Sequence, residues 1–412
     1  MVSASVPAVS VTYAWVRAIA SLLLMTIGGA GIYAVVVALK PIAAEFDASR
    51  AAVSVAYAAT SIGFAFGGLF MGWWSDRRGV AGPAILGGVA VGLGMVCVGS
   101  ATSLWQLILF QGVLIGFFGN AAVMAPLVAD ITHWFVRHRG IAIAIVISGN
   151  YVAGAVWPPI VQGLIDEQGW RAAYSTIGVF CFWTMLPLAI FLARTARIDE
   201  GATPEERIAQ TRPIGFSKLS LQCWICAAGV GCCVAMAMPQ AHIVAHVTDL
   251  GFAASRGAEM LAVMLGCGVI SRLTFGWMSD RVGGLLTLVI GSCAQMLALA
   301  LFIPTTSLVA LYAVAAFFGL SQGGIVPAYT VVIRTVFPAV EAGWRIALIM
   351  LFTLLGMALG GWMAGTVYDI TGSYDMAFVI AIIFNAFNLA IAVRLLLRQR
   401  KFVAYGAAAA PA

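Results

Sequence analysis

Long runs of apolar residues dominate the chain, and short clusters of Gly, Pro and charged residues separate them. A membrane-spanning helix needs roughly 20 apolar residues, whereas a barrel strand needs about ten residues of alternating character. The runs are long and continuous, so the pattern predicts helices. We expect about twelve spans, at approximately 15–39, 51–74, 82–101, 104–128, 140–163, 173–194, 218–245, 256–278, 285–304, 307–333, 343–367 and 375–398.

Composition supports lipid as the solvent around these helices. The 412 residues are 62% hydrophobic and 9% charged, and the mean hydropathy is +1.01, whereas a soluble domain is about 25% charged. The first run is longer than the core of a signal peptide, which has roughly 7–15 apolar residues, and therefore reads as a span. We expect a multi-pass protein embedded in a lipid bilayer, of the all-α polytopic class.

The chain reads as two similar halves. The longest polar segment, 195–217, falls between the sixth and seventh predicted spans. GWWSDRRG at 72–79 matches GWMSDRVG at 276–283, and GWRAAYSTIG at 169–178 faces GSYDMAFVIA at 372–381. The two members of each pair are separated by nearly the same distance along the chain. This repeat predicts a six-helix bundle over 1–194, a cytoplasmic linker over 195–217 and a second six-helix bundle over 218–412. Parallel halves of this kind place a substrate site near the bilayer midplane between them.

The distribution of Lys and Arg predicts the orientation. If the N-terminus is cytoplasmic, seventeen of the 22 basic residues fall on the cytoplasmic side, and Lys40, Arg50, Arg171 and Arg256 fall on the outer side. This asymmetry is typical of the positive-inside rule, and it predicts cytoplasmic N- and C-termini in an inner membrane. The basic residues are scattered rather than gathered in one patch, so no nucleic-acid partner is expected.

The duplicated turns are candidates for gating. Each copy combines glycines that allow close approach and tight turning with an acid and an arginine that can bind a neighbouring helix. Breaking such a latch would shift the balance between two conformations. The alternative is an ordinary polar turn, which two equivalent copies make less attractive. The gating candidates are Asp76, Arg77, Gly79, Asp280, Arg281 and Gly283.

Arg272 is the one basic residue that this assignment leaves inside a span, in the run LGCGVISRLTFGWMSDRVG. An arginine stays charged and costs at least a few kcal/mol at the bilayer centre, and its planar fork suits a carboxylate. No acid is expected deep in any span, with Asp130 near a helix end. We therefore predict that Arg272 binds an anionic substrate, and the alternatives are snorkelling or an ion pair with an acid on another helix.

Other polar residues in the spans are weaker candidates for substrate binding. Asn120 and Asn150 follow Gly-rich turns of the fourth and fifth spans, and Tyr33 and Tyr329 belong to a candidate aromatic lining. Interhelical hydrogen bonding and packing are the competing interpretations for each. His242 lies near the outer end of the seventh span, where it could gate or couple protons or be a solvated interfacial histidine.

The DRxG turns after the second and eighth spans resemble the loop signature of the major facilitator superfamily over essentially the whole chain. YAVVVALKPIAAEFDASR at 33–50, HWFVRHRGIAIAIVISGNYVAG at 133–154, HIVAHVTDLGF at 242–252, ISRLTFGWMSDRVG at 270–283 and GTVYDITGSYDMAF at 365–378 are similar to its bacterial monocarboxylate-transporter and oxalate/formate-antiporter branch. The resemblance implies the twelve-helix fold and transport by alternating access.

Four departures from the family bear on mechanism. The fourth span, at 111–126, lacks the arginine of drug/proton antiporters, and GAVWPPIVQG at 154–163 matches their Gly-Pro motif poorly. Animal monocarboxylate transporters resemble the chain in the eighth span but carry an aspartate one turn before the arginine, where Gly268 stands here. The first DRxG copy has Val80 where the family usually has a basic residue.

These observations predict a secondary transporter of a small organic anion, with a monocarboxylate as the favoured class, coupled to a proton or a counter-anion. The alternatives are another solute, such as an aromatic acid, a vitamin or a drug, and a membrane sensor without flux. An enzyme is not expected, because HExxH, GxSxG and a buried carboxylate pair are missing. GxxxxGK[ST] is missing as well, so ATP is not expected to drive transport. We expect no cofactor or metal, and we expect the protein to be a monomer. Eight cysteines are present, and the CxxC formed by Cys223 and Cys226 lacks a second metal-binding or redox pair.

Overall fold

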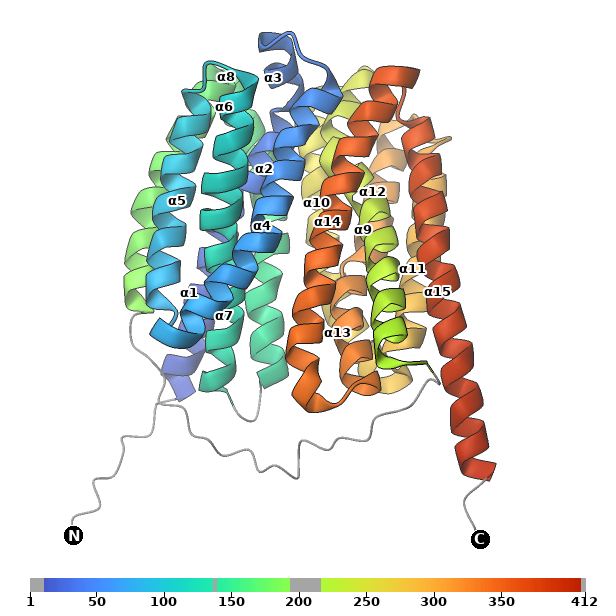
Figure 1. Cartoon of the computed structure of the whole chain (residues 1–412). Coiled ribbons are helices and arrows are strands. Elements are labelled where there is room, and N and C mark those ends of the chain that lie inside the picture. The colour runs from blue at the N-terminus through green and yellow to red at the C-terminus, as the bar shows by residue number, and fades with distance from the viewer. Residues whose placement is uncertain (1–10, 136–138, 193–215, 409–412) are drawn as a thin grey trace, which may run out of the picture.

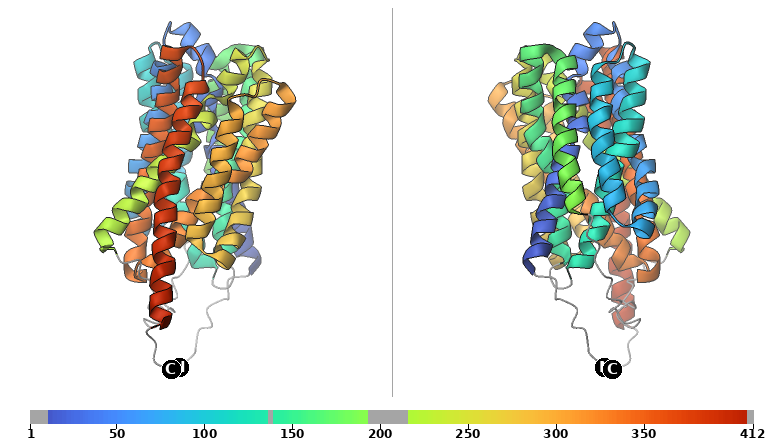
Figure 2. Two further views of the ribbon diagram at one scale, coloured as in Figure 1. Left: turned by 90° about the vertical axis from the view of Figure 1, so that its right-hand side faces the viewer. Right: turned by 90° about the vertical axis from the view of Figure 1, so that its left-hand side faces the viewer.

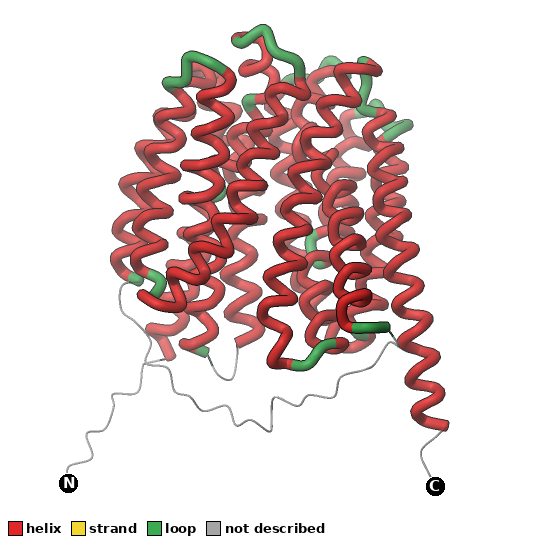
Figure 3. Tube along the Cα trace, viewed as in Figure 1, coloured by secondary structure: helices red, strands yellow, loops and turns green. Residues whose placement is uncertain are grey.

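The computed structural model describes residues 11–135, 139–192 and 216–408, and every element in these ranges is a helix (Figure 3). The all-α class is confirmed. The residues predicted as the linker fall almost wholly outside the described residues. The earlier helices are α1 (Val11–Gly28), α2 (Ala30–Val37), α3 (Leu39–Glu45), α4 (Arg50–Arg78), α5 (Ala81–Gly99), α6 (Leu104–Leu109), η1 (Phe110–Asn120), α7 (Ala121–Trp134) and α8 (Arg139–Phe191). The later ones are α9 (Lys218–Asp249), α10 (Ala254–Val282), α11 (Gly284–Phe302), α12 (Leu308–Gln322), α13 (Ile325–Val336), α14 (Ala339–Thr371) and α15 (Asp375–Ala408).

The helices form two groups that stand side by side, one from α1–α8 and one from α9–α15 (Figure 1). The first turn of α1 and the last turns of α15 lie at the same end of the molecule, and the two views of Figure 2 agree on this placement. We call this end the lower end and the opposite one, where α3 lies, the upper end. Large apolar side chains face outward along the helices, with Trp183 69% exposed and Val309 81% exposed. A surface of this kind requires lipid rather than water around it.

Eleven helical segments in the described ranges are long and apolar enough to span a bilayer. One of them, Ile141–Phe191, has 51 residues, which at 1.5 Å per residue would be about 77 Å long and far exceeds a bilayer core of about 30 Å. Gly169 interrupts it with a φ of 79°, so the chain turns back there. The segment therefore holds the fifth and sixth predicted spans.

Three predicted spans are not straight helices. The first is divided at Gly29 into α1 and α2, the fourth contains the π-helical stretch η1, and the tenth is divided at Gly323–Gly324 into α12 and α13. Irregular backbone inside a membrane is tolerated where protein buries it or where it lines a cavity. These interruptions free backbone carbonyls for contacts between helices.

The repeat predicted from sequence has a structural counterpart in the backbone. α4 and α10 each have 29 residues, and α5 and α11 each have 19. Gly79 and Gly283 close the matching turns with φ of 79° and 86°, and Gly169 and Gly372 do so with 79° and 74°. Positive φ favours glycine because other residues meet a steric penalty there. Gly79 and Gly283 also agree in ψ, at 174° and 155°, so they carry equivalent turns, whereas Gly169 and Gly372 share only the positive φ, with ψ of 161° and 2°.

Candidate functional site

Arg272 lies half-buried on α10, where it contacts the first group of helices. Its Nη1 donates a hydrogen bond to the carbonyl of Ile147 on α8 at 3.0 Å, and its Nε donates to the carbonyl of Gly323 at 3.2 Å. The guanidinium lies 4.1 Å from the centre of the Tyr151 ring. Among the described residues no carboxylate forms an ion pair with it. Arg272 is thus held by backbone carbonyls and an aromatic face.

Gly268, one turn before Arg272, packs against Tyr151. A Cβ placed at residue 268 would lie 2.3 Å from two ring atoms of Tyr151, which is far closer than carbon atoms approach without displacement. An aspartate at this position therefore requires Tyr151 to move away from Arg272. The ring that stacks on the guanidinium occupies the space that an acid would need.

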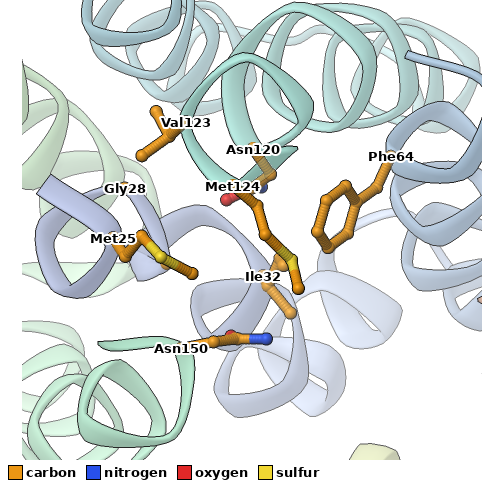
Figure 4. A pocket seen from close by; sticks show the side chains of 9 residues that line it. Met25, Gly28, Ile32, Phe64, Asn120, Val123, Met124 and Asn150 are labelled. Atoms are coloured by element: carbon orange, nitrogen blue, oxygen red, sulfur yellow. The ribbon is translucent and has the colours of Figure 1, made fainter. Parts of the chain in front are cut away.

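Tyr33, Asn150 and Asn120 continue the site into the first group of helices. The Tyr33 hydroxyl donates to the Asn150 carbonyl at 3.1 Å, and it lies 3.4 Å from the Asn150 side-chain oxygen. Asn150 and Asn120 border a cavity of about 20 Å³, which has room for about one water molecule. In Figure 4 the two amides lie on opposite sides of this pocket, with Met25, Met124 and Phe64 around the space between them. Ile147 and Asn150 are three residues apart on α8, so this pocket adjoins the anchor of Arg272.

Tyr329 does not join this arrangement. It is 2% exposed, and its hydroxyl donates to the Asn388 side chain on α15 at 2.6 Å. Asn388 in turn donates to the Ser292 hydroxyl on α11 at 2.8 Å. This polar cluster joins α11, α13 and α15, so Tyr329 makes the interhelical hydrogen bond that the sequence left as the alternative to substrate contact.

His242 lies in a different polar cluster, near the upper end of α9. It is 1% exposed, which excludes a solvated interfacial histidine. Its Nε2 lies 2.8 Å from the carbonyl of Gly361 on α14, and its Nδ1 lies 3.0 Å from the hydroxyl of Tyr374. Burial raises the pKa of the Tyr374 hydroxyl above its ordinary value, so Tyr374 stays a neutral hydrogen-bond donor.

Ion pairs at this upper end join the two groups of helices. Arg50, at the start of α4, binds both carboxylate oxygens of Asp249 at the end of α9, and Lys40 binds the same carboxylate at 3.0 Å. Arg50 also donates to the Tyr374 hydroxyl at 2.8 Å. The carboxylate of Asp369 on α14 accepts from the backbone N–H groups of Arg50 at 3.0 Å and Ala51 at 2.7 Å, at the positive end of α4. We call Lys40, Arg50, Asp249, Asp369 and Tyr374 the upper clamp.

The duplicated turns lie at the lower end and have matching local contacts. Gly79 N–H donates to Ser75 O at 2.8 Å, and Gly283 N–H donates to Ser279 O at 3.0 Å. Arg77 stacks on Trp73 at 4.1 Å and Arg281 on Trp277 at 4.3 Å. Asp280 is exposed and has no ion pair among the described residues, while the side chain of Asp76 lies outside them. The gating role of the six turn residues stays a prediction.

One charged pair was missed by the sequence analysis. Arg17, which the charge tally assigned to the cytoplasmic side, is fully buried within the first span. It donates to both carboxylate oxygens of Asp130 at 2.6 and 2.9 Å and to the Leu192 carbonyl at 3.0 Å. The expectation that Arg272 is the only strong charge inside a span is therefore wrong. Arg17 near the start of the first span and Asp130 near the end of the fourth span come together only in the folded protein, so the sequence does not reveal the pair.

Other contacts of the site also lack a sequence signal. The carbonyls of Ile147 and Gly323 are backbone groups, which every residue carries, so only the fold selects them. The clamp residue Asp249 has a signal, because an acid ends the seventh span on the side where Lys40 and Arg50 are expected.

Comparison with known proteins identifies the family. The family model described as Major Facilitator Superfamily matches residues 19–271 and 223–410. Monocarboxylate transporter 13 of Rattus norvegicus is 26% identical over 325 residues, which are 77% of this chain and 72% of the rat protein. The MFS-type transporter YcxA of Bacillus subtilis is 24% identical over 361 residues, 84% of this chain and 86% of that protein. These relatives are transporters rather than enzymes.

A solved structure shares the fold. The bacterial homologue of the human lysosomal transporter Spinster, in an inward-facing and unoccupied conformation, aligns with a TM-score of 0.69 at 18% identity. The alignment covers 96% of this chain and 98% of that one. At this identity the likeness extends to the fold alone.

Proposed function

The chain belongs to the major facilitator superfamily and is a membrane transporter, and we propose that its substrate is a small organic anion, with a monocarboxylate as the favoured class. Arg272 carries this proposal, because it is a half-buried cation that no described carboxylate neutralises. Of its five N–H groups, two donate to backbone carbonyls and the guanidinium also contacts the Tyr151 hydroxyl, so at least two N–H groups remain for a carboxylate.

The surroundings of Arg272 favour a singly charged substrate with an apolar body. One arginine supplies one positive charge, so a second carboxylate on the substrate would lack a counter-charge here. The adjoining pocket offers the amides of Asn120 and Asn150 between Met25, Met124 and Phe64. Such a lining suits an apolar body with a hydrogen-bonding group, and the cavity must widen from its present volume of about 20 Å³ to admit one. Relatives named monocarboxylate transporters support the same class.

We further propose that transport proceeds by alternating access of the two halves, 1–194 and 218–412, in an inner membrane with cytoplasmic termini. The upper clamp then closes the outer mouth, and the lower turns face the cytoplasm. Arg272 bonds to Ile147 across the boundary between the halves. A substrate anion that replaced this carbonyl as the acceptor would remove the hydrogen bond between the halves. A ligand shifts a conformational equilibrium only if its contacts differ between the two conformations, and the loss of this bond is such a difference. Coupling to a proton or exchange for a counter-anion completes the cycle.

The substrate class is tested first by binding. The purified protein is screened by thermal shift against pyruvate, lactate, formate, oxalate, benzoate and nicotinate, because a ligand that binds only the folded state raises the melting temperature. We expect singly charged acids to stabilise the wild type and to lose this effect in Arg272→Lys. Arg256→Ala is the matched control, because Arg256 lies on the same helix and pairs only with Glu259 among the described residues.

Flux is tested by counterflow in proteoliposomes loaded with the acid that binds. Accumulation of labelled acid that depends on the internal acid identifies a transporter of that acid. Saturable binding without counterflow would instead favour a sensor. Stabilisation by neutral drugs or vitamins, with none by any carboxylate, would contradict the organic-anion proposal and favour another solute.

A further inference from the structure

The buried imidazole of His242 joins the two halves beneath the upper clamp. α9 and α14 supply His242 and Gly361, the turn after α14 supplies Tyr374, and α4 of the first half supplies Arg50 and Ser54. His242 is 1% exposed, and its two ring nitrogens have different partners at 2.8 and 3.0 Å. A titratable ring is thus enclosed between parts of the molecule that must separate when the outer mouth opens.

The partners determine the tautomer. The Gly361 carbonyl can only accept, so Nε2 of His242 carries a proton and donates to it. The Ser54 hydroxyl donates to the Arg50 carbonyl at 2.7 Å and therefore turns a lone pair toward the same Nε2, 3.4 Å away. Arg50 donates to the oxygen of Tyr374, and the Tyr374 hydroxyl can then donate to Nδ1. The closed mouth therefore requires a neutral His242 with an unprotonated Nδ1.

A proton on Nδ1 breaks this arrangement. The nitrogen that accepted from Tyr374 becomes a donor, so the Tyr374 hydroxyl loses its acceptor while it still receives the Arg50 donor. A second cation also comes to lie one hydroxyl group away from the Arg50 guanidinium. A buried polar group without a partner destabilises the closed form, and an unpaired charge destabilises it more.

Separation of the halves reverses the local charge. The cations Lys40 and Arg50 belong to the first half, whereas Asp249 and Asp369 belong to the second half together with His242. Opening the mouth therefore removes two positive charges from the surroundings of His242 and leaves the carboxylates, while water reaches the ring. The charged and titratable groups that act on His242 directly are Arg50, Asp249, Asp369 and Tyr374, and those that border these groups or His246 are Lys40, His246, Tyr368 and Asp375.

We propose that His242 is a proton-binding site that is filled from the outer side when the mouth opens and must be empty before the upper clamp can close. The site takes a proton alone and needs no substrate. Acid outside then holds the transporter in the open form that captures substrate. This inference depends on the proposed function only in treating the upper end as the outer mouth of the transport path.

The opening of the mouth can be measured without substrate. Spin labels are attached through Ser100→Cys and Thr306→Cys, two exposed loop positions at the upper end of different halves, after the exposed Cys223 and Cys293 are replaced by serine. Distances are recorded from about pH 8 to about pH 5.5, a range that includes the ordinary histidine pKa of about 6.5. We expect the population with the longer distance to grow on acidification, by up to about tenfold per pH unit for a single proton.

Two variants test whether His242, rather than a neighbouring group, causes the pH response. His242→Gln retains a donor for Gly361 but does not titrate, so its distances should be independent of pH. His246→Gln is the matched control, because His246 is also buried on α9 and contacts Tyr374 only through its ring; it should respond like the wild type.

The possible outcomes decide the proposal. A wild type whose distances do not change with pH would overturn it, and so would a pH response that survives in His242→Gln or disappears only in His246→Gln. If His242→Gln fails to fold, Tyr374→Phe takes its place. It is expected to open the mouth at every pH because it removes the hydroxyl that links Arg50 to His242, and a mouth that stays closed in this variant would overturn the proposal. Because no organic acid is present, a negative result leaves the substrate screen unaffected.

Discussion

Arg17 and Arg272 are two arginines placed inside spans with opposite electrostatic surroundings. Arg17 is 0% exposed and donates to both oxygens of the Asp130 carboxylate, so its charge is neutralised within the protein. Arg272 is half-buried and rests on two carbonyls and the Tyr151 ring. Burial alone therefore does not identify a functional charge in a membrane protein. The useful distinction is whether the fold supplies the counter-charge, because a cation left without one remains able to bind an anion.

The largest effect is expected when the complete pair is broken. Asp130→Ala leaves Arg17 buried and unpaired, which typically costs about 3–5 kcal/mol of unfolding free energy. Unfolding in detergent by denaturant measures this loss. The double variant Arg17→Met and Asp130→Leu removes both charges and should recover most of the stability. Equal stability of the single and double variants would contradict the counter-charge interpretation.

Arg272→Ala should behave in the opposite way. Organic-anion uptake should fall about a hundredfold or more, which corresponds to about 2.7 kcal/mol, within the range of one or two hydrogen bonds to a charged group. The melting temperature should fall less than in Asp130→Ala, because the carbonyls of Ile147 and Gly323 lose a donor but no charge is left without its partner. Uptake in proteoliposomes and thermal unfolding give the two readouts. Unchanged uptake of every acid that the wild type carries would falsify the role of Arg272.

Gly268→Asp tests whether Arg272 loses its function when it is given an acidic partner, as Arg17 has in Asp130. The new carboxylate must displace Tyr151 and can then neutralise Arg272, so we expect uptake to fall about tenfold at neutral pH. Protonation of the aspartate should restore uptake only below its ordinary pKa of about 3.9, because the adjacent guanidinium favours the ionised carboxylate. Gly268→Ala introduces the steric conflict without the charge. If both variants show the same loss and the same pH profile, displacement of Tyr151 alone explains the effect.

The smallest effect is expected at Glu341, a half-buried acid that binds the buried Arg345, because the amide oxygen of a glutamine there can still accept from the arginine. Hydrogen bonds from Lys218 and then Arg345 hold the pKa of Glu341 below its usual value. A lowered carboxylate pKa stabilises the fold above the unfolded value of about 4.3, and the benefit is lost as the pH falls through the folded value. Glu341→Gln should therefore be slightly less stable than the wild type at pH 7 and equal to it in acid. A difference that grows on acidification would have the wrong sign.

Much of the fold could be predicted because the bilayer imposes a length and a polarity on each span. The runs predicted the helices, and the two copies of the DRxG turn predicted the repeat that Gly79 and Gly283 display in their backbone. The interruptions at Gly29 and Gly323–Gly324 were not predicted, because an apolar run reads the same whether its helix is continuous or broken.

The candidate site could be predicted only in part. Arg272 stood out because a charge in an apolar run is costly, and Asn120 and Asn150 border one pocket as their positions suggested. Tyr329 and His242 have side chains suited to a ligand but bind other parts of the protein. Residue type does not reveal which partner a helix on the far side of the bundle will provide.

The amino-acid sequence by itself determined the membrane setting, the helical class, the repeat and the presence of an arginine inside an apolar segment, where its charge requires a partner. These properties follow from local chemistry, since hydropathy, glycine turns and charge are carried by each segment alone. Only the tertiary structure decided which partner each arginine has: Arg17 pairs with Asp130, Arg50 pairs with Asp249, and Arg272 donates to backbone carbonyls. Ion pairs and hydrogen bonds act over a few ångströms in space, and the residues that form these contacts are separated by 51 to 199 positions in the chain.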